Sequence, residues 1–212
     1  MSRLPIWIRQ HLVAIRAMIV LTIITGAIYP LAVLGLGQAI FRNQANGSMV
    51  TFHGKVVGSA LLCQEFTDAK GNPLPRYFQP RPSAAATTTS IGTSKYGCDP
   101  ADSAGTNLGP DSATLAKNAA SYKTAYEQMY HVSAAQVPPD AITTSTSGLE
   151  PFISPRNADI QAAEVAHARH LPLPTVMNLV TKYTQGRDLG FLGEPRVNVV
   201  TLNIALDELP GQ

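Results

Sequence analysis

Residues 17–40 read AMIVLTIITGAIYPLAVLGLGQAI and contain no charged residue. As an α-helix, which rises about 1.5 Å per residue, this stretch reaches roughly 36 Å. That length crosses a hydrocarbon core of about 30 Å with some tilt. The alternative, a cleaved signal peptide, usually has an apolar part of about 7 to 15 residues and a small-x-small cleavage site. This run is longer and continues into FRNQANGS without such a site, so we expect a retained single-pass anchor over residues 17–41.

Charges on either side of the span predict its orientation. Three arginines precede it, and Arg42 alone follows it closely. Because cytoplasmic flanks carry the excess of Lys and Arg, we expect residues 1–16 in the cytoplasm. Residues 42–212 then form a domain outside the cytoplasm.

The outer region carries little net charge. The whole chain has a formal net charge of +2, but four of its 16 basic residues lie at or before Arg42. Residues 43–212 therefore hold 12 basic and 14 acidic residues, a net charge of −2. The basic excess belongs to the anchor, so a nucleic-acid surface is not expected.

Small residues within the span indicate partner helices. Gly26, Gly35 and Gly37 remove side-chain bulk, and Pro30 frees a backbone carbonyl and favours a kink. In lipid, small residues let helices approach closely. The alternative is an anchor that simply tolerates glycine, but a lone anchor gains nothing from such a face. We therefore expect these four residues to meet another membrane helix.

Cys63 and Cys98 are the only cysteines, and the expected compartment is oxidising. A disulfide between them would stabilise the domain by about 3 to 4 kcal/mol on the chain-entropy model. The bond requires Cα atoms within about 7 Å, which the sequence does not determine. A disulfide and two free thiols stay open as alternatives, whereas the number and spacing of the cysteines do not indicate zinc.

The pattern of the outer region predicts one α+β domain. Residues 47–62 alternate β-branched and polar residues around His53-Gly54, which indicates a hairpin. Residues 67–110 are rich in Pro, Gly, Ser and Thr, so we expect an extended segment draped over the domain rather than building its core. Residues 195–209, PRVNVVTLNIALDEL, alternate apolar and polar residues and are predicted to form a strand with one buried face.

Three helices are predicted between these strands. The first follows Asp111, an expected N-cap, and carries an aromatic stripe around Tyr126 that we interpret as core packing. The second begins at Ser154-Pro155, since serine caps free N–H groups and proline suits the first helical position. It is expected to run to about His170, and the third helix follows Pro174.

The sequence lacks the nucleotide-binding P-loop, the nucleophile elbow and the two-histidine zinc-protease motif. Glu164, His167 and His170 lie three residues apart on the predicted second helix, so neighbouring pairs share a face suited to a metal. The alternative is a solvated polar face near a helix C-terminus. A membrane-anchored metal-binding protein or enzyme is the functional hypothesis that this group supports.

Residues 143–158, TTSTSGLEPFISPRNA, combine hydroxyl side chains with a glycine before a helix. Such a loop suits an anion, but Glu150 would repel one. A tight calcium site needs about six to eight oxygens and usually several carboxylates. We therefore interpret the loop as turns held by hydroxyl-to-backbone hydrogen bonds and ended by a helix cap.

Several motifs occur together in a fixed order from about Thr25 to Asp207. They read TGAIYPLAVLGLGQAIF, ANGS, GSALLCQEF, YFQPRPSA, TNLGP, VPPDAITTSTSGLEPFISP, VAHAR, LGFLGEPRVNVV and LNIALD. Together they make the chain resemble the C subunit of the Kdp-type potassium-transporting ATPases. The resemblance marks residues 143–158 as a signature loop. Its candidate residues are Ser145, Ser147, Gly148, Leu149, Glu150, Ser154 and Pro155.

The resemblance implies an accessory, non-catalytic subunit of a high-affinity potassium pump in a bacterial or archaeal plasma membrane. The implied partners are a channel-like potassium-conducting subunit, a P-type subunit that hydrolyses ATP and a small hydrophobic subunit. The family's C subunit is described as a chaperone that raises the ATP affinity of the P-type subunit. We expect no cofactor on this chain, with ATP and potassium handled by the complex, because a domain outside the cytoplasm does not meet cytoplasmic ATP.

The sequence also departs from the family pattern. That pattern usually has glycine in place of Cys63, aspartate in place of Glu150, and His or Asn in place of Phe152. Residues 85–104 are longer and richer in Thr and Ser than expected. These departures weigh against a shared chemical role for Glu150 and Phe152 and make Cys63 a feature particular to this chain.

Overall fold

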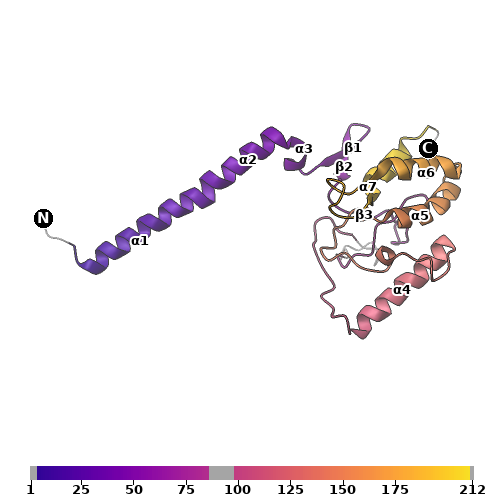
Figure 1. Cartoon of the computed structure of the whole chain (residues 1–212), viewed down its shortest axis with the longest axis horizontal. Coiled ribbons are helices and arrows are strands. Elements are labelled where there is room, and N and C mark those ends of the chain that lie inside the picture. The colour runs from indigo at the N-terminus through magenta and orange to yellow at the C-terminus, as the bar shows by residue number, and fades with distance from the viewer. Residues whose placement is uncertain (1–3, 86–97, 211–212) are drawn as a thin grey trace. The chain divides into compact units, whose positions relative to one another are not determined.

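The computed structural model describes residues 4–85 and 98–210 (Figure 1). The Thr- and Ser-rich segment at 85–104 therefore lies largely outside the described residues. The chain divides into two compact units, Met1–Ser48 and Met49–Gln212. The second unit mixes helices with two small sheets, as the α+β prediction expected.

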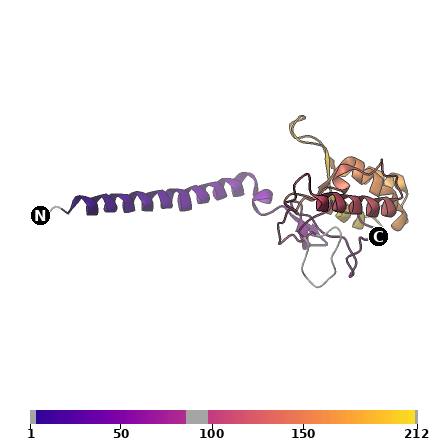
Figure 2. The same ribbon diagram turned by 90° about the horizontal axis from the view of Figure 1, so that it is seen from below.

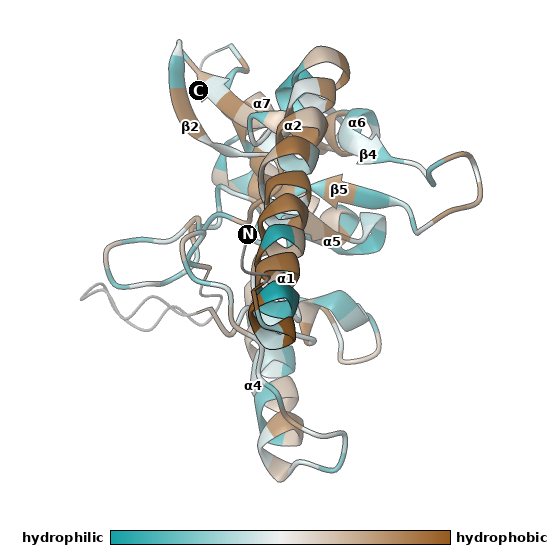
Figure 3. Ribbon diagram, turned by 90° about the vertical axis from the view of Figure 1, so that its left-hand side faces the viewer, coloured by the Kyte–Doolittle hydropathy of each residue, from teal (hydrophilic) through white to brown (hydrophobic). Residues whose placement is uncertain are grey.

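The first unit is an apolar helix. It consists of α1 (Ile6–Ile23), a π-helical turn (Ile24–Ile28) and α2 (Tyr29–Ile40), and the short helix α3 (Arg42–Ala45) follows. Ile6–Ile40 has a mean hydropathy of 2.2, and its length and composition allow it to cross a membrane. Figure 3 colours most of this helix as hydrophobic. The helix begins at Ile6, earlier than the span predicted at residues 17–41.

Pro30 accounts for the π-helical turn. Because proline has no N–H, it cannot donate the helical hydrogen bond to the carbonyl one turn earlier. The backbone widens over Ile24–Ile28, immediately before α2 begins. Local π-helical adjustment of this kind lets a membrane helix satisfy the freed backbone groups. The sequence predicts a freed carbonyl and a kink at Pro30, and the structure has a π-helical turn at this place.

The predicted N-terminal hairpin is confirmed. β1 (Met49–Phe52) pairs antiparallel with β2 (Lys55–Ser59), with an irregularity between Val50 and Thr51. His53 and Gly54 close the turn with φ values of 48° and 77°. Two consecutive positive φ angles match the right-handed twist of the strands, which is why a glycine is favoured there.

The second sheet is small and antiparallel. Its strands are β3 (Phe152–Ile153), β4 (Thr184–Gln185) and β5 (Arg196–Asn198), in the order β3-β5-β4. The surrounding helices are α4 (Ala113–Tyr130), the 3-10 turn Pro139–Ala141, α5 (Pro155–Ala168), α6 (Leu173–Tyr183) and α7 (Val199–Asp207).

Hydroxyl caps begin two of the predicted helices. Ser154 starts α5 as predicted, because its Oγ accepts a hydrogen bond from the N–H of Asn157 at 3.1 Å. The predicted cap of α4 is wrong by one residue: Ser112, not Asp111, accepts from the N–H of Leu115. α5 ends at Ala168, and α6 begins at Leu173, just before Pro174.

The predicted C-terminal strand is wrong beyond its first residues. β5 ends at Asn198, whose side chain accepts from the N–H of Thr201 at 3.1 Å and caps α7. The residues that α7 buries follow helical spacing: Val199, Val200, Leu202, Asn203, Ala205 and Leu206. Asn203 is one of the polar residues in the apparent alternation, which in a strand would put it on the solvent face, but it is only 1% exposed.

The hydrophobic core lies between α5, α6, α7 and the β3-β5-β4 sheet. Its buried residues are Phe78, Ile153, Ala158, Ala162, Val165, Ala166, Val176, Val180, Val197, Val199, Leu202 and Leu206. Phe78 corrects a prediction, since it comes from the segment expected only to drape over the domain. A smaller cluster holds Tyr126, Tyr130 and Ala141, so the aromatic stripe on α4 is core packing as predicted.

Candidate functional site

The signature loop is held by its own hydroxyl groups. The N–H of Gly148 donates to Ser145 Oγ at 3.1 Å, and the N–H of Leu149 donates to Ser147 Oγ at 3.2 Å. The carboxylate of Glu150 accepts from the N–H of Phe152 at 3.2 Å. These are the hydroxyl-to-backbone turns predicted from the sequence, and they use Glu150 locally.

Gly148 is the tightest point of the loop. Its φ is +76°, and an added Cβ would lie 2.7 Å from the carbonyl oxygen of Ala104 and 2.7 Å from Ala85 Cβ. Its own carbonyl accepts from Ser83 Oγ at 2.7 Å. Both the backbone angle and the crowding require glycine. The loop is therefore built into the domain rather than lying loosely on it.

A disulfide lies behind the loop. Cys63 and Cys98 are bonded, with Cα atoms 6.1 Å apart, and both are 4% exposed. The N–H of Cys63 donates to the carbonyl of Leu149 at 3.0 Å. The N–H of Cys98 donates to Glu65 Oε1 at 2.8 Å. The disulfide thus joins the chain after β2 to Cys98, and the Cys63 backbone contacts the signature loop directly.

Asp140 fixes the entry to α5. Its carboxylate accepts from the N–H and Oγ of Ser154, at 2.7 and 2.9 Å, and from Asn157 Nδ2 at 3.0 Å. Tyr126 donates its hydroxyl proton to Asn157 Oδ1 at 2.7 Å. A carboxylate at a helix N-terminus is favoured by the helix dipole. Asp140 carries no signal in the sequence, because nothing local links it to Ser154.

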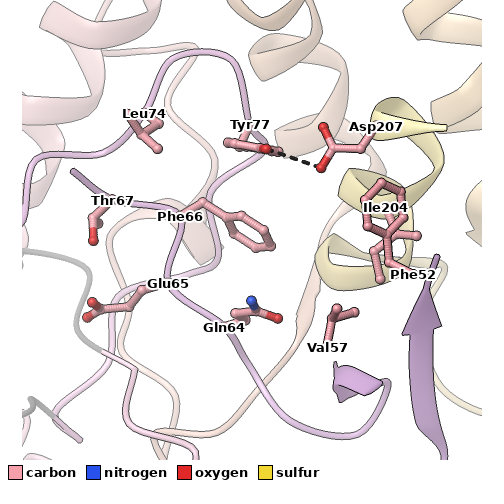
Figure 4. A pocket seen from close by; sticks show the side chains of 10 residues that line it. All are labelled: Phe52, Val57, Gln64, Glu65, Phe66, Thr67, Leu74, Tyr77, Ile204 and Asp207. Carbon is pink, nitrogen blue, oxygen red and sulfur yellow. Dashed lines mark hydrogen bonds between the residues drawn. The ribbon is translucent and has the colours of Figure 1, made fainter. Parts of the chain in front are cut away.

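A pocket of about 290 Å³ opens elsewhere on the same domain (Figure 4). It is lined by Phe52, Val57, Gln64, Glu65, Phe66, Thr67, Leu74, Tyr77, Ile204 and Asp207. The rings of Phe66 and Tyr77 lie 5.1 Å apart, so this wall is aromatic. Residues from the first hairpin, the segment after it and α7 meet here, which no sequence motif indicates.

Arg169 and Asp207 support the polar edge of this pocket. Arg169 Nη2 lies 2.7 Å from Asp207 Oδ1, and its Nε donates to the carbonyl of Arg76 at 2.6 Å. Tyr77 donates its hydroxyl proton to Asp207 Oδ2 at 3.1 Å, and the guanidinium of Arg169 lies 4.7 Å from the Tyr77 ring centre. Burial, and then the nearby Asp207 charge, raise the pKa of Tyr77. Tyr77 therefore stays protonated and donating at neutral pH.

Two buried glutamines fix the backbone beside the pocket. The backbone N–H of Gln79 donates to Gln161 Oε1 at 2.7 Å, and Gln161 Nε2 donates back to the carbonyl of Gln79 at 3.2 Å. Gln79 Nε2 donates to the carbonyls of Phe66, Leu74 and Tyr77. The Gln79–Gln161 contact joins residues far apart in the sequence, so no local pattern predicts it. Gln79 Oε1 is buried and has no hydrogen-bond partner among the described residues.

Glu164, His167 and His170 do not form the metal site that the sequence suggested. Within residues 4–85 and 98–210, no three His, Cys, Asp or Glu side chains are placed to hold a metal ion. His167 and His170 are both exposed, whereas Arg169 between them is 5% exposed. The structurally important residue of this stretch is thus the arginine, and the metal-binding alternative finds no support.

The glycines of the apolar helix have room around them within the first unit. A Cβ on Gly35 would meet nothing within 4 Å, and one on Gly26 would meet only Thr22 Cγ2 at 4.0 Å. A Cβ on Gly37 would lie 3.7 Å from Ala45 Cβ, an ordinary contact. The first unit itself therefore does not require glycine at Gly26 or Gly35.

Comparison with known proteins covers both units. A family model described as "KdpC: K+-transporting ATPase, c chain" matches residues 11–208. The chain belongs to the KdpC family. A relative named potassium-transporting ATPase KdpC subunit, from Mycobacterium tuberculosis H37Rv, is 46% identical over 202 residues, covering 95% of this chain and 99% of the relative.

Two further KdpC relatives show the same extent of similarity. The potassium-transporting ATPase KdpC subunit of Methylococcus capsulatus is 46% identical over 196 residues, covering 92% of this chain and 96% of the relative. The subunit of the same name from Myxococcus xanthus is 46% identical over 197 residues, covering 92% of this chain and 86% of the relative. The KdpC match over residues 11–208 thus includes most of the apolar helix, the signature loop and the pocket.

Proposed function

We propose that this chain is an accessory, non-catalytic subunit of an ATP-driven potassium-uptake pump, required for assembly and stability of the complex. The observation that carries the proposal is the KdpC match over residues 11–208. Its partners are a potassium-conducting channel-like subunit, a P-type subunit that hydrolyses ATP and a small hydrophobic subunit. The complex lies in a bacterial or archaeal inner membrane.

Charge and redox chemistry support one orientation. The arginines before the apolar helix favour a cytoplasmic N-terminus by the positive-inside rule, which puts the domain outside. The Cys63–Cys98 disulfide agrees with this, because disulfides persist in oxidising compartments. In that orientation the domain does not meet cytoplasmic ATP. Any effect on the ATP affinity of the P-type subunit then passes through the complex.

A cysteine-accessibility experiment tests the orientation. Gly148 is a poor position for a label because it is buried and crowded. Lys117 on α4 is exposed. In intact cells, Lys117→Cys is expected to react with a membrane-impermeant maleimide added from outside. Labelling only after the membrane is permeabilised would place the domain in the cytoplasm and overturn this part of the proposal.

The anchor contributes to assembly by packing against another membrane helix. Gly35→Leu tests this cleanly, because its added side chain meets nothing near its Cβ within the chain and leucine favours helix over glycine. We expect the variant to insert normally but to lose most of the copurified subunits, about 80% or more, because the added side chain blocks close helix approach.

Val33→Leu is the matched control, since it adds bulk at an exposed position of the same helix. It is expected to retain the partner subunits. Equal recovery of the complex with Gly35→Leu and Val33→Leu would show that Gly35 does not lie in a helix interface.

A further inference from the structure

The segment between β4 and β5 carries an exposed apolar tip, which consists of Leu189, Phe191 and Leu192. Their exposed fractions are 83%, 70% and 49%. Figures 2 and 3 both show this segment projecting from the domain, and its far end is hydrophobic in Figure 3. Single exposed apolar residues are ordinary, but three grouped at a projecting end indicate an interaction site.

The backbone of the tip is closed on itself. The N–H of Asp188 donates to the carbonyl of Leu192 at 2.9 Å, and the N–H of Leu192 donates back at 2.9 Å. Leu189 and Gly190 take φ values of 53° and 82°. Glycine adopts such angles freely, but a leucine there is strained. The turn thus holds its most exposed leucine in an unfavourable backbone conformation.

The stem below the tip pairs its charges. Arg187 forms an ion pair with Glu194 at 2.8 Å, and Arg196 forms one with Asp188 at 3.3 Å. The guanidinium of Arg196 also lies 5.2 Å from the centre of the Phe152 ring. Each arginine therefore has an acidic partner, and the stem offers no surplus positive charge.

We propose that the apolar tip is a preformed plug that inserts into an uncharged, apolar pocket on another protein subunit of the pump. The inference rests on the proposed function. A protein pocket rewards a fixed shape, because preorganisation lowers the cost of binding. Backbone strain retained at an exposed turn fits that use.

A lipid surface fits the tip less well. Peripheral membrane contacts usually combine apolar side chains with Lys or Arg that attract anionic headgroups. Here both stem arginines are paired with acids. A bilayer also accepts apolar groups of any shape, so it would not require Leu189 to adopt a positive φ.

Photo-cross-linking in the assembled complex identifies the occupant. A benzophenone amino acid placed at Phe191 of the full chain is expected to give an adduct with another pump subunit on irradiation of membranes. The same probe at Lys117, an exposed position on α4, is the control. Adducts only with lipid, adducts only with a second copy of this chain, or no yield above the Lys117 control would each overturn the inference.

Leu189→Asn separates binding from folding. Asparagine tolerates a positive φ better than leucine, so the variant chain is expected to melt at the same temperature or higher. Because the variant loses apolar surface, the amount of the other pump subunits that copurifies with it in detergent is expected to fall about fivefold or more. Lys117→Asn, a polar change elsewhere, is expected to retain them. Unchanged retention with Leu189→Asn would overturn the inference alone, whereas no copurification by the unaltered chain would overturn the proposed function.

Discussion

Arg169 Nη2 and Asp207 Oδ1 lie 2.7 Å apart and join the end of α5 to the end of α7. The Arg169 side chain is fully buried, whereas Asp207 is 27% exposed. Because Tyr77 donates to the same carboxylate, the pair also fixes one wall of the pocket. The Asp207 carboxylate thus holds together the end of α5, the end of α7 and the segment that contains Tyr77.

Asp207→Asn is expected to destabilise the domain by about 3 kcal/mol, because it leaves a buried guanidinium without this carboxylate. Glu194→Gln is the control, since it breaks the exposed Arg187–Glu194 pair and is expected to cost less than about 1 kcal/mol. Urea unfolding followed by circular dichroism measures both. Equal losses in the two variants would contradict the structural role assigned to Asp207.

Gly148→Ala is expected to cost about 2 to 5 kcal/mol, from backbone strain and overpacking together. Gly186→Ala is the matched control, because a Cβ there meets nothing within 4 Å. It is expected to change stability by no more than about 0.5 kcal/mol. The same unfolding measurement compares them, and a Gly148→Ala protein as stable as the control would mean that the signature loop is not packed as described.

The disulfide is expected to keep both cysteines from reacting with thiol reagents and to stabilise the domain. Thiol titration in denaturant without reductant should find no reactive thiol in the protein purified from membranes. Replacing both cysteines with alanine is expected to cost about 3 to 4 kcal/mol, the value for a loop of this length on the chain-entropy model. Detection of two free thiols per chain would contradict the bond.

Tyr77 makes part of the stability dependent on alkaline pH. Its pKa in the folded protein is raised, first by burial and then by Asp207, above the ordinary value of about 10. Its contribution is therefore fully present below pH about 10 and is lost as pH rises through the raised value. Absorbance at 295 nm should show that Tyr77→Phe removes a late-ionising tyrosine. If the tyrosine lost in Tyr77→Phe titrates with a midpoint at or below pH about 10, the raised pKa is contradicted.

Local signals predicted local structure. The uncharged run at 17–40, the turn at His53-Gly54 and the Ser154-Pro155 helix start each depend on neighbouring residues, and the structure contains all three features. The strand predicted at the C-terminus was wrong, because the alternation of apolar and polar residues would place Asn203 at the surface. It is buried because its side chain bonds both the N–H and the carbonyl of Phe78, a partner that the sequence does not indicate.

The residues that support the pocket could not be predicted either, because their partners are also distant in the sequence. Gln79 meets Gln161, and Arg169 meets Asp207, only after the helices pack. The two histidines beside Arg169 suggested a metal site because their spacing is visible in the sequence. A buried arginine at the end of a helix carries no comparable local signal.

Affinity purification of the full tagged chain from membranes in mild detergent shows whether this chain assembles with the other pump subunits. We predict that a P-type ATPase subunit and a potassium-conducting subunit elute with it in equal amounts, as identified by mass spectrometry. A chain that elutes alone, as a monomer, from cells that express those subunits would contradict the account.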